Sequence, residues 1–280
     1  MPPRAALDAP PLVWSLGRRR WPLALLVATF VVLLPGIPVA GLIGRAGRTG
    51  APSHWSPGAF LVALAHAVRA DGLLLGETLL LAFVVGVLCA ALALLVCWTA
   101  RRTRRYRTAV LLLAAVAWTL PGPVLGLGLK AAMRDVVGAS GSWFLSNVLE
   151  SGPSALPVLW VDVVRFFPCA LAILWPVVRL LPSELSDAAR LDGASPGGEL
   201  GRVVWPLTAA ACLRAALAAG VLSLGEVSAG KLVSTPAFKT YAEQVFTQMH
   251  YGVSAALAAQ CLLLLVAVAV GAALLRGNET

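Results

Sequence analysis

Residues 78–100 read TLLLAFVVGVLCAALALLVCWTA, an apolar run without a single charged side chain. A helix needs about 20 predominantly apolar residues to cross the hydrocarbon core of a bilayer. The apolar residues are continuous instead of alternating with polar ones, which excludes a strand of a transmembrane barrel. The stretch therefore predicts a membrane-spanning helix with lipid as its solvent.

The composition of the whole chain extends this conclusion. Of its 280 residues, 59% are apolar and 12% are charged, against roughly 45–50% and 25% in soluble domains. A chain of this length could not bury so much apolar surface in one water-soluble core. A soluble globule, a disordered chain and a collagen-like fibre are therefore excluded.

Five further runs predict membrane helices. Trp21–Gly44, Thr108–Leu129 and Tyr251–Leu275 contain no charge, whereas Ser154–Leu181 and Val203–Gly225 carry ionisable residues in their interiors. We expect an all-α, polytopic membrane helical bundle with a single domain over residues 21–275. Its six transmembrane helices are expected at about residues 21–44, 73–100, 108–130, 154–181, 205–226 and 251–275.

The third expected span contains two prolines and three glycines: Pro121, Gly122, Pro123, Gly126 and Gly128. Proline removes a backbone hydrogen bond and bends a helix, and glycine lets neighbouring helices approach closely. We expect this helix to be bent and tightly packed.

Lysine and arginine in the loops predict the orientation, because cytoplasmic loops carry the excess. Of the 22 such residues, thirteen fall on the side of the N-terminus, seven on the other side and two inside spans. The larger group is Arg4, Arg18, Arg19, Arg20, Arg101, Arg102, Arg104, Arg105, Arg107, Arg179, Arg190, Arg202 and Arg276. We expect the N-terminal segment 1–20 and the tail 276–280 to be cytoplasmic.

Two basic stretches allow other interpretations. Arg18–Arg20 before an apolar run, with Pro38-Val39-Ala40 at its end, also fits a cleaved signal peptide, although the run is long for one. The run at 101–107 abuts two spans and is expected to anchor the chain at the membrane surface. No nucleic-acid contact is expected.

Cysteine and histidine indicate neither a disulfide framework nor a metal site. Cys89, Cys97, Cys169, Cys212 and Cys261 lie in apolar runs without a C-x-x-C pair. The three histidines are far apart without ligand-like spacing. We expect no bound metal, and no clustered side chains suggest covalent chemistry, so the chain is not expected to be an enzyme.

Residues 225–231, GEVSAGK, match most of a phosphate-binding loop. Leu232 stands where the hydroxyl that holds Mg²⁺ is required, and a membrane helix precedes the stretch where a strand is required. We expect no nucleotide on this chain, so any ATP that drives it must bind another subunit.

The polar segment 182–206 reads PSELSDAARLDGASPGGELGRVVWP. Ser183 and Ser195 are expected to cap two short helices, with Pro196 at the first position of the second. Leu185, Ala188, Ala189 and Asp192 share one face by their spacing. Gly193 falls where a left-handed residue would end the first helix. Because a helix this short is marginal alone, a partner is expected to dock on it.

This segment resembles the EAA loop of permeases of binding-protein-dependent ABC importers. The family pattern is E-A-A, three residues, G, nine residues, I-x-L-P, and Asp187-Ala188-Ala189, Gly193, Val203 and Trp205-Pro206 occupy it. The chain departs from the pattern with Asp187 for Glu, Val203 for Ile and Trp205 for Leu. We call residues 182–206 the coupling loop.

Other stretches are similar to iron(III) importer permeases, so that the resemblance covers roughly residues 73–275. They are 120–128 in the third span, and 222–226 together with 248–252. That group often fuses two halves in one chain, and the sequence resembles the C-terminal half, leaving open whether it is a separate subunit.

The resemblance implies a type I importer permease of the bacterial inner membrane that forms the translocation path. Its implied partners are a cytoplasmic ABC ATPase dimer, an extracytoplasmic substrate-binding protein, a second permease half, identical or different, and lipid. ATP and Mg would be bound by the ATPase, with no cofactor on this chain. The implied ATPase-coupling residues are Asp187, Ala188, Ala189, Asp192, Gly193, Ala194, Arg202 and Pro206. Iron(III) or a similar small solute is the implied substrate.

Charged residues inside the membrane form a second candidate site. Asp162 and Arg165 are one helical turn apart and are expected to pair on one face, while Arg214 lies midway along the fifth span. Such groups normally face a bundle interior or a wet cavity. A static ion pair is the simpler interpretation; a lining of the translocation path by Asp162, Arg165, Arg214 and Glu226 is the functional one.

A secondary transporter driven by an ion gradient is the alternative function. Such a protein should show inverted repeats and acidic sites at the midplane. The sequence shows no internal repeat, and Asp162 is the only deep acid.

The orientation can be tested with reporter fusions at Gly141 and Gly197. One predicted span, 154–181, lies between them, so the two reporters should report opposite sides of the membrane. The arginine distribution places Gly141 outside. Activity of both reporters on the same side would contradict the six-helix topology.

Overall fold

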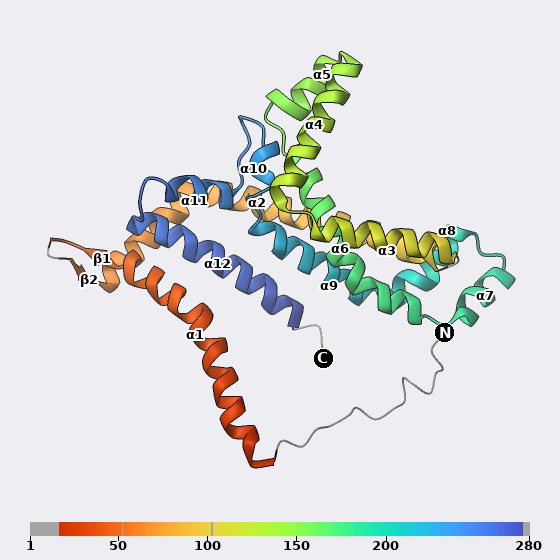
Figure 1. The fold of residues 1–280 in the computed structure, drawn as a ribbon, viewed down its shortest axis with the longest axis horizontal. Helices are drawn as coiled ribbons and strands as arrows, with labels where there is room; N and C mark the ends of the chain where they lie inside the picture. The colour runs from red at the N-terminus through yellow and green to blue at the C-terminus, as the bar shows by residue number, and fades with distance from the viewer. Residues whose placement is uncertain (1–16, 52, 102, 277–280) are drawn as a thin grey trace.

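The computed structural model describes residues 17–51, 53–101 and 103–276. The predicted N-terminal segment and C-terminal tail lie almost entirely outside the described residues, as do Arg4 and Arg102. The described chain is a helical bundle with one two-stranded hairpin (Figure 1).

The elements follow one another along the chain as helices, short turns and one hairpin. They are η2 (Gly17–Arg19), α1 (Arg20–Ala46), β1 (Arg48–Thr49), β2 (His54–Trp55), α2 (Pro57–Ala100), α3 (Arg104–Thr119), α4 (Gly122–Ser140), α5 (Trp143–Ser146), η3 (Asn147–Ser151), α6 (Leu156–Leu180), α7 (Ser183–Leu191), α8 (Pro196–Glu199), η4 (Leu200–Val204), α9 (Trp205–Leu224), α10 (Gly230–Val233), α11 (Tyr241–Met249) and α12 (Ala255–Arg276). The strands pair antiparallel, with Arg48 opposite Trp55.

Five helices in the described part of the chain are long and apolar enough to cross a membrane, or six if a bent pair counts as one span. These are α1, α2, α6, the helix that ends with α9, and α12, and the bent pair is α3 with α4. The all-α multi-pass membrane architecture expected from the sequence is confirmed. The predicted spans 21–44, 154–181 and 205–226 agree with α1, α6 and α9 to within two residues at each end.

The second and sixth spans begin elsewhere than predicted. α2 starts at Pro57 instead of 73, because Ser56 Oγ accepts a hydrogen bond from the Ala59 N–H and Pro57 occupies the first position. Charged residues between 57 and 77 interrupt the apolar run but not the helix. α12 starts at Ala255 instead of 251, because Gly252 has a φ of +105° and Ser254 Oγ accepts from the Leu257 N–H.

The prediction of one helix over 108–130 is wrong. α3 ends at Thr119, α4 begins at Gly122, and the two axes differ by 109°. Leu120 is extended, with a ψ of 127°, because the ring of Pro121 disfavours a helical residue before it. The bend expected at the prolines is present, and it turns α4 and α5 out of the side of the bundle (Figure 1).

The core of the bundle lies between α2, α6 and α9. α2 and α9 approach closely because small residues face each other: a Cβ on Gly86 would lie 2.2 Å from the Ala216 carbonyl oxygen, and one on Gly220 would lie 2.8 Å from that of Ala82. In lipid, where helices gain little from hydrophobic association, such close backbone packing provides much of the attraction. Buried alanines continue the contact along α9, at Ala211, Ala215 and Ala219.

Helices α12 and α1 lie outside this core. α12 packs against α2 and α9, and α1 packs mainly against α12 (Figure 1). None of the most apolar window of α1 is buried within the chain. α11 is held to the bundle by Tyr241, whose N–H donates to Thr78 Oγ1 at 2.8 Å and whose hydroxyl donates to the Gln260 carbonyl at 3.3 Å.

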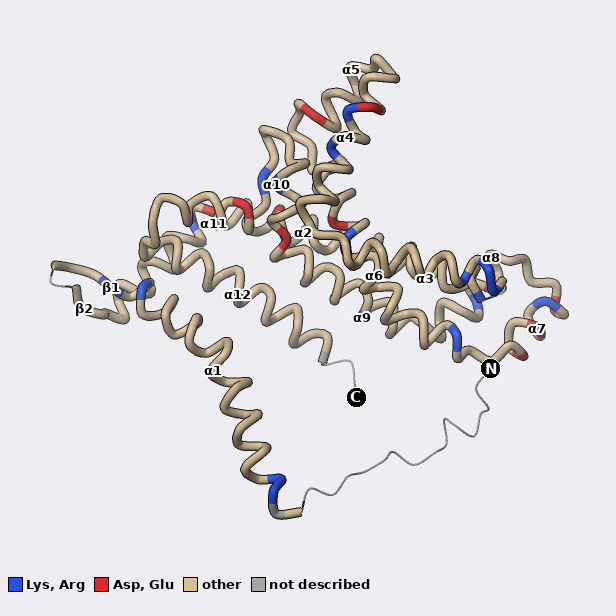
Figure 2. The backbone as a smooth tube through the Cα atoms, viewed as in Figure 1, with Lys and Arg blue, Asp and Glu red and all other residues tan. Residues whose placement is uncertain are grey.

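Seven arginines of the expected cytoplasmic loops gather at one end of the bundle, whereas the arginines at the start of α1 lie apart from them. Figure 2 shows Lys and Arg concentrated where α2 ends, α3 begins and α7 and α8 lie. The described members of this group are Arg101, Arg104, Arg105, Arg107, Arg179, Arg190 and Arg202. We call this the coupling-loop end.

The α2–α9 contact predicts that Gly86→Val is destabilising. The new side chain would collide with the Ala216 carbonyl, and overpacking of this kind costs about 1–3 kcal/mol. The midpoint of unfolding in mixed detergent micelles, followed by circular dichroism, should fall. Gly76→Ala on the same helix, where a Cβ meets nothing within 4 Å, should leave the midpoint unchanged or higher; an equal loss for both variants would argue against the contact.

Candidate functional site

The coupling loop forms two short helices joined by a tight turn, as its sequence predicts. Gly193 is left-handed, with a φ of +80°. The Gly193 N–H donates to the Arg190 carbonyl and the Ala194 N–H to the Ala189 carbonyl, both at 2.9 Å. This pair of bonds is a Schellman turn, which satisfies the last carbonyls of α7. Glycine is favoured here because most side chains strain this conformation.

One of the two predicted caps is correct. Ser195 Oγ accepts from the Gly198 N–H at 3.2 Å, and Pro196 takes the first position of α8. Ser183 is not a cap: it is the first residue of α7, and Pro182 precedes it without a side-chain cap. Proline fixes the entrance of α7 through its own backbone angle, so the serine hydroxyl is not needed there.

The outer face of α7 is apolar and open. Leu185 is 44% exposed, Leu191 is 89% exposed, and Ala188 lies exposed between them. Because these three apolar residues adjoin on one face of a nine-residue helix, they form a candidate contact surface. The helix presents this face away from the rest of the chain.

The other predicted coupling residues lie around this helix and the start of α9. Asp187 and Asp192 are exposed, Gly193 is exposed in the turn, and Ala189 and Ala194 are half-buried. Arg202, in η4, and Pro206, in the first turn of α9, are also exposed.

Glu199 is the buried centre of the loop. Its side chain is 3% exposed, and its carboxylate accepts two hydrogen bonds from Arg190 at 3.1 Å, from Nε and from Nη2, both to Oε2. Trp98 Nε1, from the last turns of α2, donates to Oε1 at 3.5 Å. We call Glu199, Arg190 and Trp98 the Glu199 clamp; it joins α7, α8 and α2.

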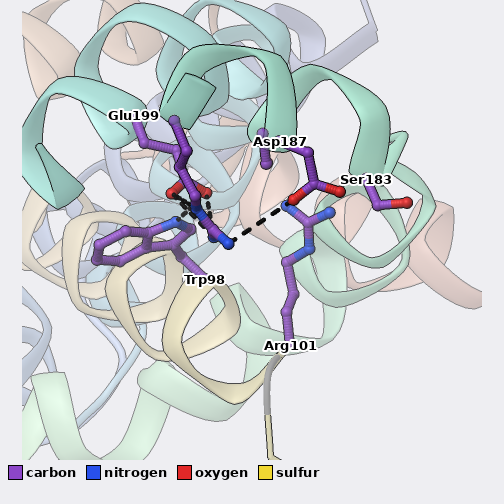
Figure 3. Close-up of a pocket in the computed structure, with 7 residues that line it drawn as sticks. Trp98, Arg101, Ser183, Asp187 and Glu199 are labelled. Carbon is purple, nitrogen blue, oxygen red and sulfur yellow. Dashed lines mark hydrogen bonds and ion pairs between the residues drawn. The ribbon is translucent and has the colours of Figure 1, made fainter. Parts of the chain in front are cut away.

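A cavity of about 190 Å³ lies beside the clamp (Figure 3). It is lined by Trp98, Arg101, Ser183, Ser186, Asp187, Arg190 and Glu199. Arg190 Nη1 also lies 3.7 Å from Asp187 Oδ1 one turn away, and Arg101 Nη2 donates to the Leu181 carbonyl at 3.0 Å. The ends of α2, α6 and α7 are thus connected by polar contacts.

The clamp residues were not among the predicted site residues. Glu199 falls in the second short helix predicted for the loop, where nothing in the sequence indicates burial, and Trp98 is about 100 positions away in an apolar span. The one available signal was that Glu199 precedes a membrane helix. An acid that is buried at such a position needs a cationic partner.

The intramembrane charges form a second cluster, with a different pairing from the one predicted. Arg165 does not pair with Asp162 on its own helix; its Nε lies 2.5 Å from Glu226 Oε2. The other oxygen of Glu226 accepts from Ser228 Oγ at 2.6 Å and from the Ala229 N–H at 2.8 Å. The turn after α9 places the Glu226 carboxylate beside Arg165 of α6.

Asp162 is left as a buried carboxyl next to this pair. It is 2% exposed, and its Oδ1 has no hydrogen-bond partner among the described residues. Arg214 is half-buried in α9. The structure thus brings Arg165 and Glu226 together, with Asp162 in electrostatic range of both.

α4 closes over the cluster. A Cβ on Gly122 would lie 2.1 Å from Ser228 Oγ and 3.2 Å from Arg165 Nη1, and one on Gly126 would lie 2.8 Å from the Ala229 carbonyl. These two glycines provide the close packing expected of the third span. Gly128 faces open space.

The segment 225–231 does not form a phosphate-binding loop. It follows helix α9 instead of a strand, and Glu226 occupies the Ala229 N–H that a phosphate would require.

Among the described residues, no three His, Cys, Asp or Glu side chains are grouped to hold a metal ion. An apolar groove of about 540 Å³ also lies between α3 and α6.

Comparison of the sequence with models of protein families finds no match, and comparison with curated proteins finds none either. The geometry of the coupling loop and of the charged cluster therefore carries the functional argument.

The Arg165–Glu226 pairing predicts a large cost for Arg165→Ala. Removing one partner leaves the other charge buried and uncompensated, at about 3–5 kcal/mol. The double variant Arg165→Ala/Glu226→Gln should recover most of this loss in detergent unfolding, because no buried charge remains.

The exposed pair Arg134–Glu150 is the matched control for this experiment. Its N–O distance is 3.9 Å, with side chains 70% and 35% exposed, so Arg134→Ala should cost less than about 1 kcal/mol. Equal costs for Arg165→Ala and Arg134→Ala, or no recovery in the double variant, would show that the buried pair is not formed.

Proposed function

We propose that the chain is the membrane-spanning permease subunit of an ATP-driven importer. In this function the bundle forms the translocation path, and the coupling loop receives the movement of a separate cytoplasmic ATPase. The chain supplies no covalent chemistry and no nucleotide site of its own. A second permease half, an extracytoplasmic binding protein and lipid complete the proposed assembly.

The observation that carries the proposal is the open apolar face of α7. Leu191 is 89% exposed, although the helix it ends is fixed at both ends, by Pro182 at its start and by the Schellman turn after it. A rigid helix with an unpartnered apolar face fits insertion into a groove of a partner, because little conformational entropy is lost on binding. The coupling-loop end also carries seven of the arginines expected to be cytoplasmic, so the ATPase would dock at this end.

The substrate follows from the resemblance alone. Iron(III) or a similar small solute is proposed, delivered by the binding protein from the opposite end of the bundle. The Asp162, Arg165 and Glu226 cluster lies toward that end, near the start of α6, and would line the path where the two permease halves meet.

A second candidate is a gradient-driven secondary transporter. Asp162 is the observation that favours it, because a buried carboxyl with an oxygen that lacks a protein partner is the kind of group that takes up a proton or an ion. An uptake assay in proteoliposomes separates the two functions. Uptake of solute without an ATPase, under a proton gradient, would support the secondary transporter and overturn the importer.

The importer function predicts that Gly193→Asp and Leu191→Asp prevent ATPase docking. Both place a carboxylate at the docking surface, where its desolvation opposes binding. Co-purification of the ATPase and binding-protein-stimulated hydrolysis should both be lost. Membrane abundance should be unchanged, since neither residue lies in a span.

Two controls separate shape from charge. Gly193→Asn should retain the ATPase, because asparagine tolerates the left-handed conformation. Gly197→Asp adds the same charge at an exposed position of the loop that meets nothing within 4 Å and should also retain it. Normal binding and hydrolysis with both Leu191→Asp and Gly193→Asp would mean that α7 is only a connector.

A further inference from the structure

The coupling loop is continuous in sequence with two helices of the core, α6 and α9, but not with the third, α2. α7 continues from α6 through residues 181–182, and α8 continues through η4 into α9. α2 has the most extensive contacts with both α6 and α9, yet its chain ends at Ala100, far in sequence from the loop. A direct link from α7 to α2 must therefore be made by side chains.

The Glu199 clamp is the side-chain link that the structure provides. The Glu199 carboxylate lies between Arg190 of α7 and Trp98 of α2, with the three hydrogen bonds already described. A guanidinium that holds a carboxylate by two nitrogens fixes orientation as well as distance. The Arg101 bond to the Leu181 carbonyl is a second tie, from the end of α2 to the end of α6.

Burial favours the pair on the α7 side of the link. Glu199 is 3% exposed and Arg190 is 45% exposed, so losing the arginine would leave a buried carboxylate without its cationic partner, at a large cost. When α7 moves, the lowest-energy response is for Glu199 and Trp98 to move with Arg190. The contact therefore acts in both directions, since a coupling between two positions is reciprocal.

We propose that Glu199 is a positioning residue that transmits displacement of α7 to α2, so that ATPase movement opens and closes the path. The opening and closing of the path rests on the proposed importer function. The contacts of the Glu199 clamp do not depend on that function. Glu199 touches neither nucleotide nor substrate in this arrangement; it acts through Arg190 and Trp98.

The test uses Glu199→Gln and Trp98→Phe in the full transporter, singly and together. Glutamine keeps the shape and loses the charge, and phenylalanine keeps the ring and loses the N–H donor. Transport per ATP hydrolysed should fall about tenfold in the double variant, within the 5–150-fold range of allosteric coupling, while ATPase co-purification stays normal. The matched controls are Glu77→Gln, exposed on α2, and Trp143→Phe, 79% exposed on α5, which should leave the ratio unchanged.

A distance measurement tests the clamp without any partner. Spin labels at Leu191 of α7 and Thr99 of α2, both exposed, are attached to cysteines in a variant whose native cysteines are replaced by alanine. The distance distribution in lipid nanodiscs should be narrow with the clamp intact and broader in the Glu199→Gln/Trp98→Phe background.

The outcomes are distinguishable. An unchanged distance distribution overturns the clamp, and a broader distribution with unchanged transport per ATP overturns its coupling role. Failure of the unmodified chain to bind any ATPase overturns the importer function, whereas the distance measurement still decides whether α7 and α2 are linked. Loss of ATPase binding in the double variant would show that the clamp shapes the docking surface instead of transmitting motion.

Discussion

The close approach of α2 and α9 at Gly86 and Gly220 is the contact on which the rest of the bundle depends. Lipid does not drive helices together by excluding them from water, so the two backbones must gain from direct contact. Because neither glycine carries a side chain, the helices reach a separation at which α6 can pack against both. The buried core, the charged cluster and the coupling-loop end are all placed by these three helices.

Polar side chains then connect the turns and loops to the helices of the core. Glu226 connects the turn after α9 to α6 through Arg165, and Glu199 connects α8 to α7 and α2. Both carboxylates are buried and both meet an arginine, as expected where an isolated charge would be costly. The two clusters lie apart along the bundle, one at the start of α6 and the turn after α9, the other at the end of α2 and in the coupling loop.

The sequence predicts most of the helices because their signal is local. Charge-free runs locate α1 and the apolar parts of α2 and α12, and Gly193 and Pro196 predict the turn of the coupling loop. The start of α2 was missed because Arg69, Asp71 and Glu77 interrupt the apolar run, whereas the helix continues through them and begins at Pro57. The pairing of Arg165 with Glu226, and of Glu199 with Trp98, could not be predicted, because each joins residues brought together only by the packing of separate helices.

Helix α2 is longer than one crossing of the membrane requires. Its 44 residues make a rod of about 66 Å at 1.5 Å per residue, roughly twice the hydrocarbon thickness of about 30 Å. One end carries Trp98, and the other begins beside the hairpin and passes Asp71, which contacts Gln260 of α12. A rigid rod of this kind is a lever: tilting it by about 5° about its centre displaces each tip by about 3 Å in opposite directions. In the proposed importer, a tilt of α2 would therefore move its two ends together.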